Sequence, residues 1–237
     1  MALADLAVQR SFWNGWNAEH REHRRHEVSQ RQTDVVLDWL ASLGRTDLDI
    51  VDVGCGAGWL CPQLLRFGRV TGTDLSDEVL ARAQQRTPEV RFVAGDFMQV
   101  ELAPASFDVV VSLEVLSHVS DQPAFLRKVA GLLRPGGHLM LATQNRFVLQ
   151  HFNRVPPPQP GQLRRWVDRA ELRRLLQAEF EVRELFSVSP LANRGVMRLV
   201  NSRKLNTPIR ALFGDRVERL KEAAGLGWTL MALARKR

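Results

Sequence analysis

The strongest constraint on the fold is a regular alternation of short apolar runs with helix-like segments over the first two thirds of the chain. The runs with strand character lie at residues 49–53, 69–73, 90–94, 107–113 and 138–143. Segments with helical periodicity or a capping residue flank them, at 34–43, 59–66, 76–86 and 122–133. This alternation predicts an α/β fold with a parallel, doubly wound sheet, which binds ligands at the carboxyl ends of its strands.

The last third of the chain departs from this alternation. Residues 155–161 (VPPPQPG) predict a stiff connector, 168–178 a helix and 181–188 a sixth strand. Residues 189–226 do not alternate cleanly, and 227–237 return to a strand pattern. For a length of 237 residues, we expect one domain with extra elements.

A glycine-rich turn follows the first predicted strand. Gly54, Gly56 and Gly58 let the chain turn sharply and let backbone amides approach a ligand. Asp74 ends the second strand, 20 residues after Gly54, where a carboxylate can accept hydrogen bonds from ribose hydroxyls. Dinucleotide-binding proteins share these features, although their third glycine would fall at Trp59. The turn alone therefore leaves the cofactor class open.

Six short motifs over roughly residues 45–145 carry a resemblance to a known family. They are DVGCGAG (52–58), GTDLS (72–76), AGDF (94–97), FDVV (107–110), EVLSHV (114–119) and LRPGG (133–137). In this order they resemble the class I S-adenosylmethionine-dependent methyltransferases, especially the small-molecule branch that includes the ubiquinone-type enzymes. The resemblance implies a Rossmann-like, doubly wound, seven-stranded sheet that is mostly parallel with an antiparallel last strand.

The resemblance also implies a division of the chain. Residues 1–237 would form a single methyltransferase domain, with an N-terminal helical lid at 1–44 and a cofactor-binding core at 45–150. The C-terminal half, 151–237, would carry a substrate-specificity insertion at about 189–226. The cofactor would be S-adenosylmethionine, with S-adenosylhomocysteine as the product.

The family's cofactor contacts transfer to matching positions in this chain. The glycine loop would pack against the methionine part of the cofactor, and Asp74 would bind the ribose hydroxyls. Asp96 would accept a hydrogen bond from the adenine amino group, or else cap a turn, while Leu75 and the Phe97 amide would meet the adenine ring. Asp52 would brace the loop. The implied cofactor-binding residues are Asp52, Gly54, Cys55, Gly56, Gly58, Asp74, Leu75, Asp96, Phe97 and Leu113.

Methyl transfer from a sulfonium needs in-line alignment of acceptor, methyl and sulfur, and a hydroxyl or ammonium acceptor must also lose a proton. His118 follows the fourth strand and titrates near neutral pH, so it is the leading candidate for the base, with loop bracing as the alternative. Glu114 would lie near the transferred methyl and is the second catalytic candidate. Two ligands do not make a divalent-cation site, so we predict no metal.

Three further segments supply candidates for the acceptor site. Trp13 and Trp16 share one helix face, either as a packed lid or as a stacking surface. Asn145 and Arg146 follow the fifth strand, where they can bind a polar or anionic group or serve loop hydrogen bonding. Residues 162–166 (QLRRW) lie where the family places specificity elements. The predicted substrate-binding residues are Trp13, Trp16, His20, Asn145, Arg146, Arg165 and Trp166.

The positive charge is concentrated near the C-terminus. Residues 1–150 carry 15 Lys and Arg against 18 Asp and Glu, whereas residues 151–237 carry 18 against 8. A basic region can face an anionic partner or be a solvated surface. Folded over the acceptor side, it would form a positive entrance from Arg164, Arg165, Arg194, Arg198, Arg203 and Arg210.

We therefore predict methyl transfer to an O, N or C nucleophile of a small, anionic metabolite in secondary or glycan metabolism. The alternative, suggested by the arginine excess, is an RNA or protein methyltransferase. Against a nucleic-acid acceptor, residues 113–116 (LEVL) lack the Asn-Pro-Pro-Tyr type of motif found in amino-methylating nucleic-acid enzymes.

Other sequence properties bear on the localisation and the oligomeric state of the protein. The chain has no run of about 18 apolar residues, so we expect no membrane span. Residues 1–10 show no signal-peptide pattern, and Cys55 and Cys61 cannot staple a chain of this length. We expect a cytoplasmic monomer or homodimer.

Overall fold

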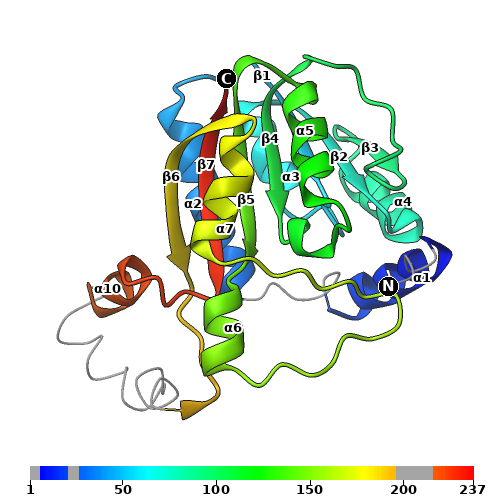
Figure 1. Cartoon of the computed structure of the whole chain (residues 1–237). Helices are drawn as coiled ribbons and strands as arrows, with labels where there is room; N and C mark the ends of the chain where they lie inside the picture. Colours follow the sequence, from blue (N-terminus) through cyan, green and yellow to red (C-terminus); the bar gives the residue numbers. More distant parts are fainter. Residues whose placement is uncertain (1–5, 21–26, 196–215) are drawn as a thin grey trace.

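The computed structural model describes residues 6–20, 27–195 and 216–237. Within these residues, seven strands form one sheet in the order β3-β2-β1-β4-β5-β7-β6 (Figure 1). Neighbouring strands are parallel except that β7 runs antiparallel to both β5 and β6. The predicted fold class, a mostly parallel Rossmann-like sheet with an antiparallel last strand, is confirmed.

The central strands are buried on both faces of the sheet. The strands are β1 (Leu48–Val53), β2 (Gly68–Asp74), β3 (Arg91–Ala94), β4 (Phe107–Leu113), β5 (Leu133–Gln144), β6 (Phe180–Val188) and β7 (Thr229–Lys236). Successive residues of β4, Val109, Val110 and Val111, are all fully buried although their side chains alternate between the faces. Such continuous apolar runs suit a parallel sheet covered by helices on both sides.

The helices cover the two faces of this sheet. They are α1 (Leu6–His20), α2 (Glu27–Ser42), α3 (Cys61–Leu64), α4 (Asp77–Arg86), α5 (Gln122–Leu132), α6 (Arg146–Phe152), α7 (Arg169–Gln177) and α10 (Arg216–Ala223), with 3-10 turns η1 (Leu65–Phe67) and η2 (Leu116–His118). One apolar cluster packs Phe125 of α5 and Leu172 of α7 against the sheet, and a second packs Trp39 of α2 and Leu64 of α3. The sheet therefore lies between two layers of helices.

Several element boundaries differ from the sequence predictions; helix α2, for example, begins at Glu27 rather than at residue 34. Two of the differences have a clear structural reason. The helix predicted at 59–66 is only one turn of α-helix followed by η1, because the chain must enter β2 at Gly68. A Cβ at Gly68 would lie 2.0 Å from the Leu48 carbonyl oxygen, so β2 begins where only glycine fits. Strand β5 begins at Leu133 rather than 138, because Leu133 already pairs with Phe107 of β4.

The carboxyl ends of β1, β2, β4 and β5 meet at one edge of the sheet, which α1 and the connector cover. Helix α1 packs on α4, and the connector that follows α6 crosses beside it (Figure 1). A Cβ at Gly161 of this connector would lie 2.7 Å from the Val8 carbonyl oxygen, so α1 and the connector are in close contact. Because β7 is antiparallel, its first residue, Thr229, pairs with Gln144 at the same edge.

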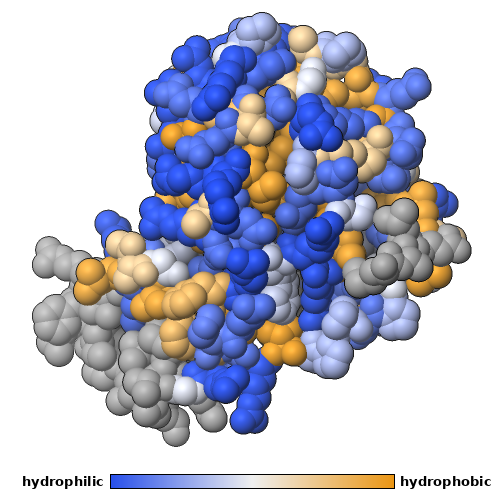
Figure 2. All heavy atoms as spheres, viewed as in Figure 1, coloured by the Kyte–Doolittle hydropathy of each residue, from blue (hydrophilic) through white to orange (hydrophobic). Residues whose placement is uncertain are grey.

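Among the described residues, no helix combines the length and the apolar character needed to cross a membrane. The face in Figure 2 is mostly hydrophilic, with apolar side chains at its lower left around α10, where Leu220 is exposed. Much of the predicted insertion at 189–226, with Arg198, Arg203 and Arg210, lies outside the described residues.

Candidate active site

A cavity of about 610 Å³ lies at the carboxyl edge of the sheet. Its walls come from the segments that follow four parallel strands, residues 53–57, 73–75, 95–98 and 113–119, together with α1, α2 and the connector. The volume suits a small-molecule ligand. Motifs that are up to about 60 residues apart in sequence thus meet at one place, as the doubly wound topology requires.

The glycine loop is held to the second strand by backbone hydrogen bonds. The Gly54 amide donates to the Thr73 carbonyl oxygen at 2.7 Å, and the Gly56 amide donates to Asp74 Oδ2 at 2.8 Å. Gly54 has a φ of +75°, and a Cβ there would lie 2.1 Å from Val115 Cγ2. Only glycine therefore lets this loop pass so close to the segment after β4.

Two carboxylates follow β2 and β3 and line the cavity. Asp74 accepts one backbone amide on each oxygen, from Gly56 and from Ser76 at 2.9 Å. Asp96 accepts the Met98 amide at 3.0 Å, so it both caps a turn and faces the cavity. A carboxylate has about four acceptor sites, so both side chains keep capacity for hydroxyl or amino donors. Leu75 and the buried Phe97 line the same region.

Asp52 is a buried acid beneath the glycine loop. Its side chain is 2% exposed, and Cys61 Sγ donates to its Oδ2 at 3.6 Å. Burial raises the pKa of Asp52 to about 7, and the nearby Asp74 charge adds to the rise. A hydrogen bond with Cys61 and burial raise the pKa of Cys55, so this loop residue stays a neutral thiol. Asp52 and Cys55 both border the cavity.

Glu114 stands directly after β4 in a strained backbone conformation. It has a φ of +65°, which is rare for residues other than glycine and often marks functional positions. Its Oε1 accepts Gln32 Nε2 at 2.5 Å and Thr229 Oγ1 at 2.9 Å. Donors from α2 and from the start of β7 therefore fix this carboxylate at the cavity wall, beside Leu113.

His118 also lines the cavity, with its ring held from two sides. Its Nδ1 lies 2.6 Å from the Leu163 carbonyl oxygen, and the Trp13 ring contacts it edge-on with centroids 4.7 Å apart. Because a carbonyl can only accept, Nδ1 carries the proton and Nε2 keeps its lone pair. Burial lowers the pKa of His118 to about 4 despite the Leu163 contact, so the ring is neutral at physiological pH.

Helix α1 brings its two predicted tryptophans to the cavity, but not its histidine. Trp13 and Trp16 line the wall with ring centroids 5.7 Å apart. His20 stacks on the outer side of Trp16 at 5.3 Å and is exposed, and it does not line the cavity. Asn17 does, and its buried Nδ2 donates to Ser76 Oγ at 2.7 Å. This bond ties α1 to the cap of α4.

The candidates that follow the fifth strand and those in the connector fall into two groups, one that lines the cavity and one that bonds other parts of the fold. Trp166 lines the cavity, and the Arg164 guanidinium lies 5.7 Å from its ring centroid. Arg165 instead donates to the Ser120 carbonyl oxygen and points away. Asn145 is buried and donates to backbone carbonyls of the segment before β7, at 2.9 and 3.1 Å. Arg146 pairs with Asp168 and with a glutamate of α7.

Three residues predicted to contact the acceptor, Asn145, Arg146 and Arg165, therefore have other partners. A fourth, His20, is exposed and does not line the cavity. Asn145 and Arg146 join elements of the fold, and the Arg165 side chain holds the connector to Ser120, in the segment that follows η2. Among the arginines of the expected positive entrance, Arg164 lines the cavity and Arg194 is exposed outside it. Among the described residues, only one arginine of the expected entrance, Arg164, therefore borders the cavity.

Several lining residues escaped prediction because they come from segments without a motif. Asn17, Gln32 and Trp228 lie on α1, on α2 and just before β7. Nothing in their local sequence marks them, since only the tertiary fold brings them to the cavity. Within the described parts of the chain, no group of three His, Cys, Asp or Glu side chains is placed to hold a metal ion.

The cavity can accommodate a nucleoside cofactor. Asp74 and Asp96 supply acceptors for ribose and base donors, and Leu75 and Phe97 supply apolar surface for a ring. The glycine loop leaves little room for side chains beside α1, since a Cβ at Gly56 would lie 3.2 Å from Asn17 Oδ1.

Comparison with known proteins agrees with this geometry. Residues 51–141 match a family model described as a methyltransferase domain. A probable S-adenosylmethionine-dependent methyltransferase of Mycolicibacterium smegmatis is 35% identical over 162 residues, covering 67% of this chain and 61% of that protein. A ubiquinone biosynthesis O-methyltransferase of Ralstonia nicotianae is 38% identical over 118 residues, covering 46% of this chain and 49% of that protein. The chain thus spans about half to three fifths of these relatives.

A solved structure shares the fold over the whole chain. The Burkholderia thailandensis 1,6-didemethyltoxoflavin-N1-methyltransferase, solved with 1,6-didemethyltoxoflavin and S-adenosylhomocysteine bound, superposes with a TM-score of 0.65. The match covers 100% of this chain and 91% of that chain at 22% sequence identity. At this identity the likeness shows a common fold.

Proposed function

Residues 51–141 form a methyltransferase domain of the class I S-adenosylmethionine-dependent type, and on this premise we propose that the chain methylates a small, anionic metabolite. The acceptor atom is an O, N or C nucleophile. S-adenosylmethionine supplies the electrophilic methyl group and leaves as S-adenosylhomocysteine.

One observation carries the proposal: a single cavity joins a nucleoside-type half to a polar rim at Glu114 and His118. We assign the first half, with Asp74, Asp96 and Phe97, to the cofactor. The rim then receives the acceptor where Leu113 borders both regions. Covered by α1 and the connector, the site can hold the two reactants in line, which replaces a bimolecular encounter with a positioned one.

We assign His118 the task of orienting the acceptor. Its neutral Nε2 can accept a hydrogen bond from a hydroxyl or amine, and its lowered pKa makes it a weak proton acceptor in water. Glu114, fixed by Gln32 and Thr229, supplies the negative charge of the rim. A hydrogen bond to either group aligns the acceptor lone pair, and the group that accepts this bond takes up the proton as the new bond to the methyl group forms.

Arg164 is the residue that supports an anionic acceptor. This guanidinium borders the cavity and donates to the Pro156 carbonyl oxygen at 2.5 Å and to Gln162 Oε1 at 2.6 Å. A guanidinium has five N–H donors, so further donors can bind a carboxylate or phosphate. Replacement by methionine should raise KM for an anionic acceptor without changing cofactor affinity.

Labelled methyl transfer tests the function. The protein is incubated with methyl-labelled S-adenosylmethionine and a host extract divided into small-molecule, RNA and protein fractions. We expect label in the small-molecule fraction with wild type and none with Asp74→Ala, whose affinity for S-adenosylhomocysteine should fall strongly in calorimetry. Label in nuclease-sensitive or protein material would instead support the RNA or protein alternative and refute the small-molecule acceptor.

A further inference from the structure

The tryptophans of the chain are concentrated in one place. The chain has six tryptophans and no tyrosine. Those that line the cavity are Trp13, Trp16, Trp59, Trp166 and Trp228. The sixth, Trp39, packs in the core against Phe186 with ring centroids 5.9 Å apart. Trp59 follows the glycine loop, beside Arg86 of α4. We assign the other four to the acceptor end, because Trp13 contacts both His118 and Trp16, and because Trp166 and Trp228 lie close in sequence to Leu163 and Thr229, which contact His118 and Glu114.

These four rings reach the acceptor end from three separate segments. Trp13 and Trp16 come from α1, and Trp13 meets His118 edge-on. Trp166 comes from the connector that is tied to η2 through the bond from the Arg165 amide to the Ser117 carbonyl oxygen at 2.7 Å. Trp228 precedes β7, and all four rings are half-buried. A ring that is partly exposed into a cavity offers apolar surface to a ligand.

The polar side chains of this end are largely engaged with one another. Gln32 donates to Glu114, Gln144 accepts from Ser117, and Gln162 accepts from Arg164. Beyond His118 Nε2 and the remaining Arg164 donors, a polyol such as a sugar would have to exchange its water hydrogen bonds for these occupied groups, which is costly in a covered site. A flat apolar ligand exchanges water for indole surface instead, at no such cost.

We propose that the acceptor of this enzyme carries a planar aromatic ring, which binds between the tryptophans of α1 and those of the connector and the start of β7. This inference rests on the proposed methyl transfer and narrows its substrate class. It favours an aromatic acid or phenol over the glycan acceptor considered from the sequence. His118 and Glu114 then lie beside the ring substituent that accepts the methyl group.

Calorimetry on the protein saturated with S-adenosylhomocysteine tests the ring directly. The aromatic probes are 4-hydroxybenzoate and 3-hydroxy-2-naphthoate. Matched controls are 4-hydroxycyclohexanecarboxylate, which keeps the charge and hydroxyl without the aromatic ring, and glucuronate. We expect both aromatic acids to bind at least about tenfold more tightly than either control, since stacking on indole adds roughly 1.4 kcal/mol, the equivalent of a factor of ten. Equal or weaker binding of the aromatic acids overturns the inference.

Substitutions place the ring in the cavity. Trp166→Leu should weaken binding of 3-hydroxy-2-naphthoate about tenfold with unchanged affinity for S-adenosylhomocysteine, and Trp228→Leu serves if that variant does not fold. Trp59→Leu, at the other end of the cavity, is the matched control and should leave aromatic affinity unchanged. Full aromatic affinity in both Trp166→Leu and Trp228→Leu overturns the inference.

The failure of this inference is distinguishable from failure of the proposed function. If S-adenosylhomocysteine binds and label from S-adenosylmethionine enters the small-molecule fraction, methyl transfer stands whatever the probes show. A product without an aromatic ring would then refute only the aromatic acceptor. If neither S-adenosylhomocysteine binding nor label transfer is found, the proposed function itself fails.

Discussion

Replacing Asp52 by asparagine should change the pH dependence of stability in a calculable way. The buried carboxyl has a pKa of about 7 in the folded chain against 3.8 as its ordinary value. The folded state therefore binds the proton more tightly, so the contribution to stability is fully present below pH 3.8 and is lost as the pH rises towards about 7. The difference of about three pKa units corresponds to roughly 4 kcal/mol.

The asparagine side chain of this variant would have the shape of the protonated acid but no ionisation. Its amide oxygen can still accept from Cys61, so the local contact survives. The advantage in unfolding free energy of Asp52→Asn over wild type should grow by about 1.4 kcal/mol per pH unit from pH 3.8 and level off above about pH 7.

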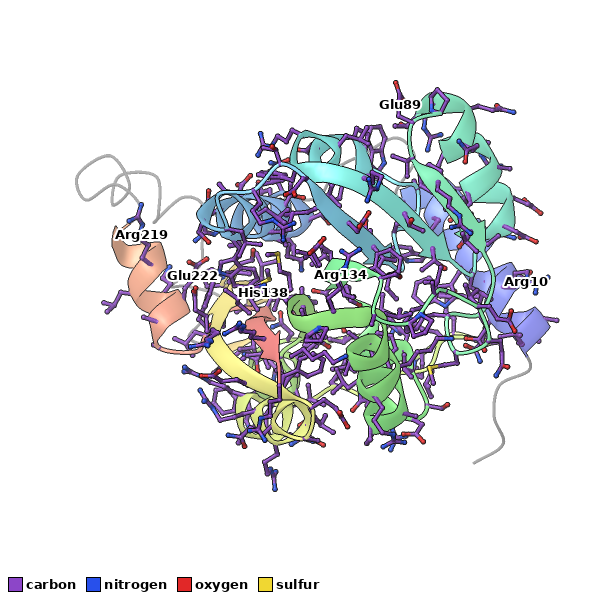
Figure 3. The ribbon with its side chains drawn as sticks, turned by 90° about the horizontal axis from the view of Figure 1, so that it is seen from above. Arg10, Glu89, Arg134, His138, Arg219 and Glu222 are labelled. Atoms are coloured by element: carbon purple, nitrogen blue, oxygen red, sulfur yellow. The ribbon has the colours of Figure 1, made fainter. Side chains whose placement is uncertain are left out.

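Urea unfolding, followed by tryptophan fluorescence at several pH values, measures this difference. The wild-type curve alone is not sufficient, because the lowered pKa of His118 has the opposite effect, with stability lost as the pH falls from 6.5 towards about 4. Glu89→Gln, which replaces an exposed carboxylate labelled in Figure 3, is the control and should show no such trend. A stability difference between Asp52→Asn and wild type that does not vary with pH would refute the reasoning.

Three further substitutions test the site and its frame. Gly54→Ala should destabilise the fold by about 1–3 kcal/mol in urea unfolding, since its Cβ would clash with Val115 in a backbone conformation with φ of +75°; wild-type stability would contradict the tight turn. His118→Ala should lower kcat with little change in affinity for S-adenosylhomocysteine, and wild-type turnover would remove His118 from the proposal. Arg134→Met should cost roughly 1 kcal/mol at low salt and less at high salt, because Arg134 bonds two aspartates at 2.5 and 2.7 Å on the partly exposed amino-terminal edge of the sheet; a salt-independent loss would point to packing instead.

The sheet and its ligand edge could be predicted because they depend on local patterns. Apolar runs marked the strands, and the parallel topology then placed Gly54, Asp74, Asp96 and His118 at one edge. Element boundaries were less predictable, as at Leu133, which pairs with Phe107 of β4 although the Pro-Gly-Gly segment that follows it signals a turn.

The acceptor side could not be predicted at the same level, because its residues are selected by distant partners. Arg146 looked available for a ligand until the fold placed Asp168 beside it, 22 residues on. Asn145 likewise bonds carbonyls about 80 residues away. In the same way, the pKa of His118 depends on burial by α1 and the connector, which no local motif encodes.

The antiparallel course of β7 separates the two halves of the site in a way that protein engineering can use. Thr229, the first residue of β7, pairs with Val188, the last residue of β6, on one side and with Gln144 of β5 on the other. The connection from β6 to β7 therefore begins and ends at paired neighbours. A loop closed in this way can change length at small entropic cost without shifting the strands. Exchanging it for a loop of other composition should alter which acceptor enters while leaving intact a cofactor half encoded before residue 120. The topology thus allows the connection from β6 to β7 to vary without disturbing the residues proposed to bind the cofactor.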